Sequence, residues 1–176
     1  IYTALTQNYE LLGYNSNAAK LGEILCQDGA ITQGLCVTLY YLASGYSPSQ
    51  INKTRLPVIA TNSPAGSSIR QGQHFAQLIT TDKFQKYDYG KVKNLEIYGQ
   101  PTPPQYNISK MTAPVAIYVG DRDIYSKKED IDKTAAAVPN LAVYRYIKGF
   151  SHLDLVWGID APSVVFNDIL EQMGRH

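Results

Sequence analysis

The chain has 176 residues, of which 44% are hydrophobic and 18% charged, and its formal net charge is +1. This composition is typical of a folded domain with a sizeable core and excludes a highly charged disordered chain. The near-neutral charge gives no electrostatic basis for binding nucleic acid or an anionic membrane, and no apolar run reaches the ~20 residues of a transmembrane segment.

The N-terminus, residues 1–8, has no initiator Met, no basic region and no cleavage-site pattern. These are the marks by which a leader sequence is recognised. We therefore expect the chain to be a segment of a longer protein, whose destination cannot be read from these residues.

The first two thirds of the chain are predicted to be mainly helical. Apolar residues recur at helical spacing in 18–26, and a second apolar segment covers 36–43. Ser47-Pro48 is a pattern that begins helices, with Ser as the N-cap and Pro in the first turn. Ser67 or Ser68 is expected to cap a further helix that runs through Ile79.

The segment 81–112 is rich in Tyr, Lys, Gly and Pro. Its Pro101-Thr-Pro-Pro104 run cannot continue a regular helix or a central strand. We expect this segment to be irregular and to lie on the surface.

The sequence changes in character near residue 110. The nearly all-apolar run 114–119 predicts a strand buried on both faces, and 141–147 predicts a second strand. A helix is expected between them at 127–138, and a final helix from Asp160-Ala-Pro162, with Val165, Ile169 and Met173 on one face. This order of elements predicts a parallel sheet.

Two residues that can do acyl-transfer chemistry follow these strands. Asp123 lies just beyond the first strand and His152 just beyond the second. Because parallel strands end at the same edge of a sheet, the two side chains are expected to meet there. An imidazole oriented by a buried carboxylate is the base of a Ser-His-Asp triad, and the order Ser, Asp, His is that of α/β-hydrolases.

Other residues compete for these roles. Asp121 is an alternative carboxylate, and either Asp can be an ordinary turn or helix-cap residue. His74, in a polar helical setting, is interpreted as a surface or packing residue, and His176 as a terminal residue. No Gly-x-Ser-x-Gly occurs, and Ser67-Ser68 fits an N-cap better than a nucleophile, so the catalytic Ser is expected upstream of Ile1.

Cys26 and Cys36 are close in sequence, and two sequons occur at Asn52-Lys-Thr54 and Asn107-Ile-Ser109. Together they favour a secretory or lysosomal route, whereas two buried free thiols in a cytosolic protein are the alternative. No further Cys or His lies close enough in sequence to complete a zinc site, and no metal or cofactor is predicted.

Several segments resemble the animal acid lipases, the gastric and lysosomal enzymes and their insect relatives. The matching segments are Asn8-Tyr-Glu-Leu-Leu-Gly-Tyr14, Ser63-Pro-Ala-Gly-Ser-Ser68, Phe84-Gln-Lys-Tyr-Asp-Tyr-Gly90, Pro103-Pro-Gln-Tyr-Asn107, Val138-Pro-Asn140 and Ser151-His-Leu-Asp-Leu-Val-Trp-Gly-Ile-Asp-Ala-Pro162. The last is the most specific, and Cys26 to Gln33 resembles the insect branch.

The resemblance implies an α/β fold: the C-terminal part of an α/β-hydrolase, a parallel sheet with flanking helices, preceded by a mainly helical cap. It implies a cap at 1–108 that includes a lid at about 14–45, and a hydrolase core at 109–176. It also implies that Asp123 and His152 are catalytic, that Cys26 and Cys36 form the lid disulfide, and that Asn52 and Asn107 lie at or near glycosylated positions.

The implied function is hydrolysis of triacylglycerols or sterol esters at a lipid–water interface, with apolar lid residues meeting the lipid. The candidate lid residues are Leu21, Leu25, Val37, Leu39 and Leu42. By itself the chain lacks the nucleophile motif and is expected to be inactive. The alternatives are another α/β-hydrolase such as an epoxide hydrolase or esterase, a catalytically inactive lipid-binding relative, and a truncated product.

Overall fold

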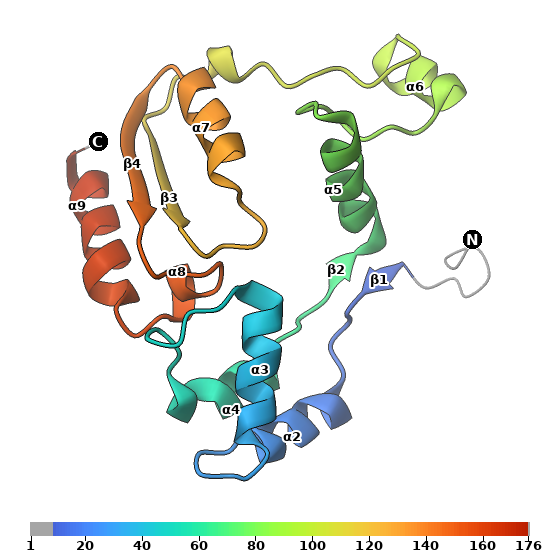
Figure 1. Cartoon of the computed structure of the whole chain (residues 1–176). Coiled ribbons are helices and arrows are strands. Elements are labelled where there is room, and N and C mark those ends of the chain that lie inside the picture. The colour runs from blue at the N-terminus through green and yellow to red at the C-terminus, as the bar shows by residue number, and fades with distance from the viewer. Residues whose placement is uncertain (1–8, 176) are drawn as a thin grey trace. The chain divides into compact units, whose positions relative to one another are not determined.

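The computed structural model describes residues 9–175. Within it the chain forms two compact units, which can be followed by their residue colours in Figure 1. The first unit contains residues up to Ala19 together with Asn62–Asn107, and the second contains Lys20–Thr61 together with Ile108 onward. Each unit therefore has packing of its own.

The second unit contains a parallel pair of strands. Strand β3 is Val115–Gly120 and β4 is Leu141–Ile147, and they are connected by helix α7, Lys128–Ala137. Tyr118 lies opposite Arg145, and Gly120 opposite Ile147. The predicted strand, helix, strand order and the parallel pairing are confirmed, as is the α/β class with helices flanking a parallel sheet.

The burial predicted for β3 is wrong over most of its length. Val119 is buried, but Ala116 is exposed, and Ile117 and Tyr118 are only half-buried. Among the described residues β3 pairs with β4 alone, so its other edge has no strand beside it. Apolar sequence indicated the strand correctly, but burial depends on neighbouring elements.

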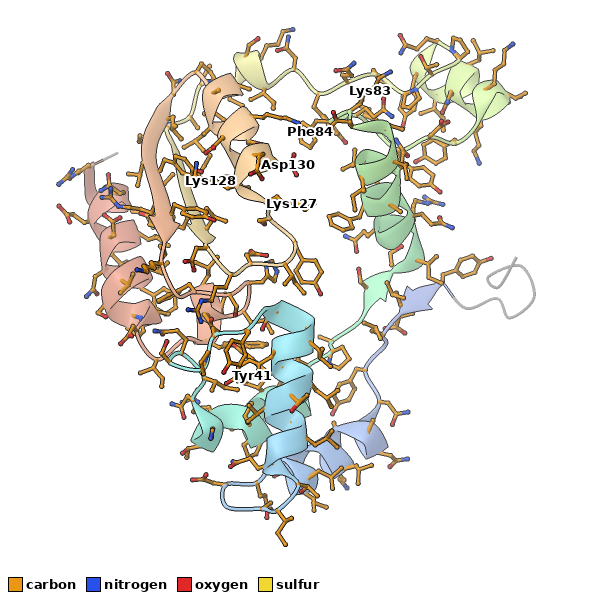
Figure 2. All side chains as sticks on the ribbon, viewed as in Figure 1. Tyr41, Lys83, Phe84, Lys127, Lys128 and Asp130 are labelled. Atoms are coloured by element: carbon orange, nitrogen blue, oxygen red, sulfur yellow. A yellow bond between two sulfur atoms is a disulfide. The ribbon has the colours of Figure 1, made fainter. Side chains whose placement is uncertain are left out.

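Helix α7 begins with charged residues that suit its position. Glu129 and Asp130 lie in the first turn, where carboxylates interact favourably with the free N–H groups. Figure 2 shows Lys127, Lys128 and Asp130 at this end of the helix. Lys128 also pairs with Asp132 one turn later, at 2.6 Å.

The C-terminal helices pack on the side of β3 and β4. Helix α8 is Asp154–Trp157, and a π-helical turn at Pro162–Phe166 leads into α9, Asn167–Arg175. Phe150, Ala161 and Val165 form a buried cluster there. The predicted final helix is present; Val165 is buried, whereas Met173 is 71% exposed.

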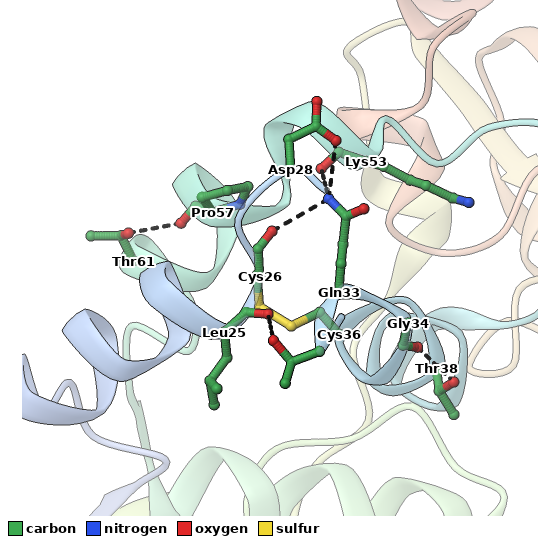
Figure 3. The surroundings of a disulfide bond; sticks show 11 residues. Leu25, Cys26, Asp28, Gln33, Gly34, Cys36, Thr38, Lys53, Pro57 and Thr61 are labelled. Carbon is green, nitrogen blue, oxygen red and sulfur yellow. Dashed lines mark hydrogen bonds between the residues drawn. A yellow bond between two sulfur atoms is a disulfide. The ribbon is translucent and has the colours of Figure 1, made fainter. Parts of the chain in front are cut away.

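Helices α2, Ser16–Leu25, and α3, Gln33–Ser44, are joined by the disulfide Cys26–Cys36. Figure 3 shows that Gln33 closes the connection, because its amide Nε2 reaches the Cys26 carbonyl, Asp28 and the Lys53 carbonyl. The disulfide therefore lies within a hydrogen-bonded turn.

A buried cluster packs beneath this turn. It contains Cys26, Tyr40, Ile51 and Leu56, the last in helix α4, Leu56–Asn62. The short 3₁₀ turn Lys53–Arg55 precedes α4. Contrary to the prediction, no helix begins at Ser47: residues 48–50 form a turn, and the Ser47 hydroxyl donates to that of Ser151.

In the first unit, β1, Glu10–Leu11, pairs antiparallel with β2, Ser67–Ser68, which leads into α5, Ile69–Thr81. Ser68 caps α5 as predicted: its hydroxyl accepts from the Arg70 N–H at 3.2 Å, and Gln71 completes a capping box. The capped start fixes where α5 leaves the small sheet.

The prediction of an irregular 81–112 segment is wrong in part, because it contains helix α6, Lys91–Tyr98. The helix carries no buried apolar stripe; its buried residue is Asn94. Gly90 and Gly99 flank it, and a short 3₁₀ turn follows at Ile108–Lys110. Local hydrogen bonds of the buried Asn94, rather than apolar periodicity, account for this helix.

Within residues 9–175, no helix is both long enough and apolar enough to cross a membrane.

Candidate active site

Asp123 and His152 form a hydrogen bond at the ends of β3 and β4. Asp123 Oδ2 and His152 Nδ1 are 2.9 Å apart. Because a carboxylate only accepts, the imidazole places Nδ1–H toward it. The Asp123 side chain is 2% exposed and that of His152 46% exposed. The buried carboxylate thus orients a ring that remains accessible to solvent.

The Asp123 carboxylate is held independently of the histidine. Its Oδ1 accepts from the backbone N–H groups of Tyr125 and Ser126, at 2.8 and 3.2 Å. The Tyr125 ring also meets the His152 ring edge-to-face, with centroids 5.0 Å apart. One carboxylate oxygen fixes the turn while the other is directed at the imidazole.

Backbone pairing continues beyond the two strands and joins their loops. The Asp121 N–H donates to the Ile147 carbonyl at 3.0 Å, and the Arg122 N–H to the Phe150 carbonyl at 2.9 Å. A Cβ added at Gly120 would lie 2.1 Å from the Phe150 carbonyl oxygen. Gly120 is therefore required for the close approach that brings the two loops together.

Asp121 occupies a different position from Asp123. Its Oδ1 accepts from the Gly149 N–H at 2.6 Å and so holds the loop that precedes His152. Of the two candidate carboxylates, Asp123 is the one that contacts the imidazole. Asp121 instead connects the loop after β3 to the backbone of the loop after β4.

A third segment, residues 44–46 at the end of α3, contacts both loops. The Ser44 carbonyl accepts from the His152 N–H, and the Tyr46 carbonyl accepts from the Arg122 guanidinium, each at 3.0 Å. Gly45 lies between them with φ of 110°, and a Cβ there would lie 1.9 Å from the Arg122 carbonyl oxygen. In the sequence, Gly45, just after the apolar segment 36–43, was the available signal for this close packing.

The remaining candidate residues lie in ordinary structural settings. His74 Nε2 is 2.8 Å from the Gln85 carbonyl oxygen, as suits a packing residue. His176 lies outside the described residues. Asn52 is half-buried and Asn107 exposed. Within residues 9–175 no group of three or more His, Cys, Asp or Glu side chains has the arrangement of a metal site.

The first unit contains a separate cavity of about 570 Å³ near the start of α5. Tyr and basic side chains line it, with Arg70 over the rings of Tyr87 and Tyr89 at 5.8 and 5.6 Å. Neither Asp123 nor His152 lines this cavity. The cavity is therefore distinct from the Asp–His pair.

Curated lipases match the chain over most of its length. Gastric triacylglycerol lipase of Bos taurus is 35% identical over 80% of the chain and 36% of the lipase. Lysosomal acid lipase/cholesteryl ester hydrolase of Homo sapiens is 34% identical over 95% of the chain and 42% of that enzyme. Lipase 3 of Drosophila melanogaster is 32% identical over 93% of the chain and 42% of that protein.

The chain belongs to the acid lipase-like family. No protein-family model matches it. This lipase-like chain spans about two fifths of the length of the human lysosomal relative, 42%. The gastric and lysosomal relatives are hydrolases of lipid esters by name. The lysosomal match, over 95% of the chain, includes both the parallel β3–β4 pair and the segment around the disulfide.

Proposed function

We propose that this chain supplies the acid and the base of a lipase that hydrolyses triacylglycerols or sterol esters. In this proposal Asp123 and His152 complete a Ser-Asp-His triad, and the Ser comes from a part of the protein outside these 176 residues. The chemistry needs no metal or cofactor. The 176 residues alone are expected to be inactive.

The 2.9 Å contact between Asp123 and His152 is the observation that carries the proposal. The carboxylate is buried and held by two backbone N–H groups, while the imidazole is partly exposed. With Nδ1–H directed at Asp123, Nε2 carries the lone pair that a general base needs. This combination of a fixed, buried carboxylate and an accessible imidazole supports a catalytic role for His152.

The proposed reaction uses both residues. His152 Nε2 takes the proton of the Ser hydroxyl as the oxygen attacks the ester carbonyl, and Asp123 stabilises the imidazolium. His152 then returns the proton to the leaving alcohol, and a water molecule repeats the sequence to release the fatty acid. Backbone N–H groups elsewhere in the protein stabilise the oxyanion.

The α2–α3 region supports a role at a lipid–water interface. Six of its large apolar side chains are 56% to 104% exposed: Leu21, Ile24, Ile31, Leu35, Leu39 and Leu42. Leu25 and Val37, also proposed for the lid, are half-buried. We propose that residues 14–45 form a lid and that its exposed residues meet acyl chains when it opens.

The proposed destination is the secretory pathway, leading to the lysosome or the extracellular space. The Cys26–Cys36 disulfide supports it, because disulfides persist mainly in oxidising compartments. The sequons at Asn52 and Asn107 are proposed glycosylation sites. The gastric and lysosomal relatives carry names that agree with either destination.

The test is hydrolysis of emulsified tributyrin and of a cholesteryl ester by the complete protein, with His152→Ala compared against His74→Ala. His152→Ala is expected to lose about 4 to 8 kcal/mol of transition-state stabilisation, whereas His74→Ala keeps the wild-type kcat. An unchanged kcat for His152→Ala would exclude the triad. A wild-type protein that binds lipid without hydrolysing it would identify the inactive relative instead.

A further inference from the structure

The loop that follows β4 and carries His152, residues 148–153, is called the histidine loop here; it leads directly into Asp154, the first residue of α8, which the proposed triad does not use. Its side chain is fully buried, with 0% exposure. Oδ1 accepts from the Tyr40 hydroxyl at 3.0 Å, and Oδ2 accepts from the Ser151 N–H at 2.6 Å. Burying a carboxylate is unfavourable unless its oxygens are hydrogen-bonded, and here both are.

These contacts act on the backbone that carries His152. The Ser151 N–H is held by Asp154, and the next N–H, that of His152, is held by the Ser44 carbonyl at 3.0 Å. Consecutive peptide groups on the approach to the catalytic side chain are thus fixed by two different partners. The direction in which the imidazole leaves the backbone depends on both.

Helix α3 supplies both contacts: Ser44 binds the His152 N–H directly, and Tyr40 binds Asp154, which holds the Ser151 N–H. Tyr40 and Ser44 are one turn apart on α3, and the Ser44 hydroxyl bonds to the Tyr40 carbonyl at 2.7 Å. Burial, and then the charge of Asp154, raise the pKa of Tyr40 above its ordinary 10.0, so the hydroxyl remains a donor. Tyr40 also packs in the core cluster that contains Cys26.

We propose that Asp154 and Tyr40 form a positioning pair that orients His152 toward Asp123. The proposal rests on the proposed function, because a positioning role has meaning only if His152 is the base. The last turn of α3, from Tyr40 to Ser44, acts through this pair as a template for the histidine loop, and it keeps these contacts when the rest of the proposed lid opens. Asp154 does not touch the reacting atoms.

The pair has a matched control in the same unit. The Tyr118 hydroxyl donates to Asp168 Oδ2 at 3.1 Å, which is the same chemistry between β3 and α9. Neither residue contacts the histidine loop through a hydrogen bond that the structure shows. Tyr118→Phe therefore measures what the loss of a Tyr–Asp bond does when no catalytic loop depends on it.

The experiment compares Tyr40→Phe, Asp154→Leu and Asp154→Asn with Tyr118→Phe in the complete protein. The first readouts are kcat and KM for a soluble short-chain ester, with the concentration of folded protein determined by near-UV circular dichroism. The second is the rate at which a small fluorophosphonate labels the Ser. The labelling rate reports activation of the Ser without a contribution from acyl-chain binding. His152→Ala is included as the reference for loss of the base.

Tyr40→Phe is expected to lower kcat about tenfold, and Asp154→Leu about 100-fold, with KM nearly unchanged. The labelling rates should fall in parallel. Asp154→Asn can still accept from Ser151 and is expected to recover most of the activity. Because the two residues act as a unit, adding Tyr40→Phe to Asp154→Leu should cause little further loss.

The outcomes separate the two proposals. If His152→Ala keeps its activity, the triad itself is wrong. If His152→Ala is inactive but Tyr40→Phe and Asp154→Leu keep the kcat and labelling rate of Tyr118→Phe, the positioning role is overturned. Should Asp154→Leu fail to fold, Tyr40→Phe alone decides between a lowered kcat and an unchanged one.

Discussion

The polar networks of the two units differ in how far along the chain they reach. In the unit with Asp123 and His152, the Tyr40–Asp154 bond joins residues 114 apart in sequence. In the other unit, the Asn94 amide bonds to Asp88 and to the Pro101 carbonyl, 6 and 7 residues away. Local networks can form early and separately, whereas long-range contacts require the whole unit to be assembled.

This difference indicates where substitutions should affect chemistry and where they should affect stability alone. Around the histidine loop, the loss of a hydrogen bond should also release His152, the proposed base. Around α6, the same kind of loss changes only the local fold. Substitutions in each network can separate these two effects.

Replacement of Asp123 by Asn should have the largest effect. The amide cannot stabilise the imidazolium and favours the wrong tautomer, so kcat should fall about 10⁴-fold. Ester hydrolysis by the complete protein measures this. Asp121→Asn is the control: its side-chain oxygen can still accept from Gly149, and kcat should stay within about threefold. Equal losses in the two variants would show that Asp123 has no special role.

Gly120→Ala should strongly destabilise the unit that carries the Asp–His pair. The new Cβ would overlap the Phe150 carbonyl, and the loops can separate only by breaking the pairing that aligns Asp123 with His152. We expect a loss of about 3 kcal/mol in the free energy of unfolding, measured by urea denaturation.

Gly99 provides the matched position in the first unit. It has φ of 71° but nothing within 4 Å of an added Cβ, so Gly99→Ala should lose only about 1 kcal/mol. A larger effect at Gly99 than at Gly120 would contradict the close approach of the loops.

Asn94→Ala should lower stability without changing catalysis. The substitution removes two donated bonds and the oxygen that accepts from the Tyr89 N–H at 3.0 Å, all at a fully buried position. A loss of about 2 kcal/mol in unfolding free energy is expected, with kcat per folded molecule unchanged. Gln100→Ala, which removes an exposed amide bond to the Thr102 carbonyl, should be nearly neutral. A fall in kcat for Asn94→Ala would contradict the conclusion that the network around α6 affects stability but not catalysis.

The smallest predicted effect is a pH dependence at Asp168. Bonds from Arg145, Gln172 and Tyr118 hold its pKa below the ordinary 3.8. Because the pKa of Asp168 is lowered, its carboxylate stabilises the folded state fully above pH 3.8. This stabilisation is lost as the pH falls through the lowered pKa. The difference in Tm between wild type and Asp168→Asn should therefore be greatest above 3.8 and shrink on acidification. A difference independent of pH would refute the linkage.

The sequence was sufficient to predict elements whose signals are local. The strand 141–147 and the Ser68 cap are confirmed by the structure. They could be predicted because apolar runs and capping patterns depend on only a few neighbouring residues. Helix α6 was missed because its buried residue is the polar Asn94, which gives no apolar periodicity. The exposure of Ala116 was missed because burial depends on which strands lie alongside.

For the candidate site, the sequence alone identified the residue types, their order along the chain and the edge of the sheet at which they should meet. It left Asp121 and Asp123 as alternatives, and it gave no role to Asp154 or Ser44. Tertiary structure decided these points, because the approach of β3, β4 and the end of α3 determines which oxygen faces which N–H. Chemistry follows from side-chain type, but the assignment of partners depends on contacts between segments up to 114 residues apart.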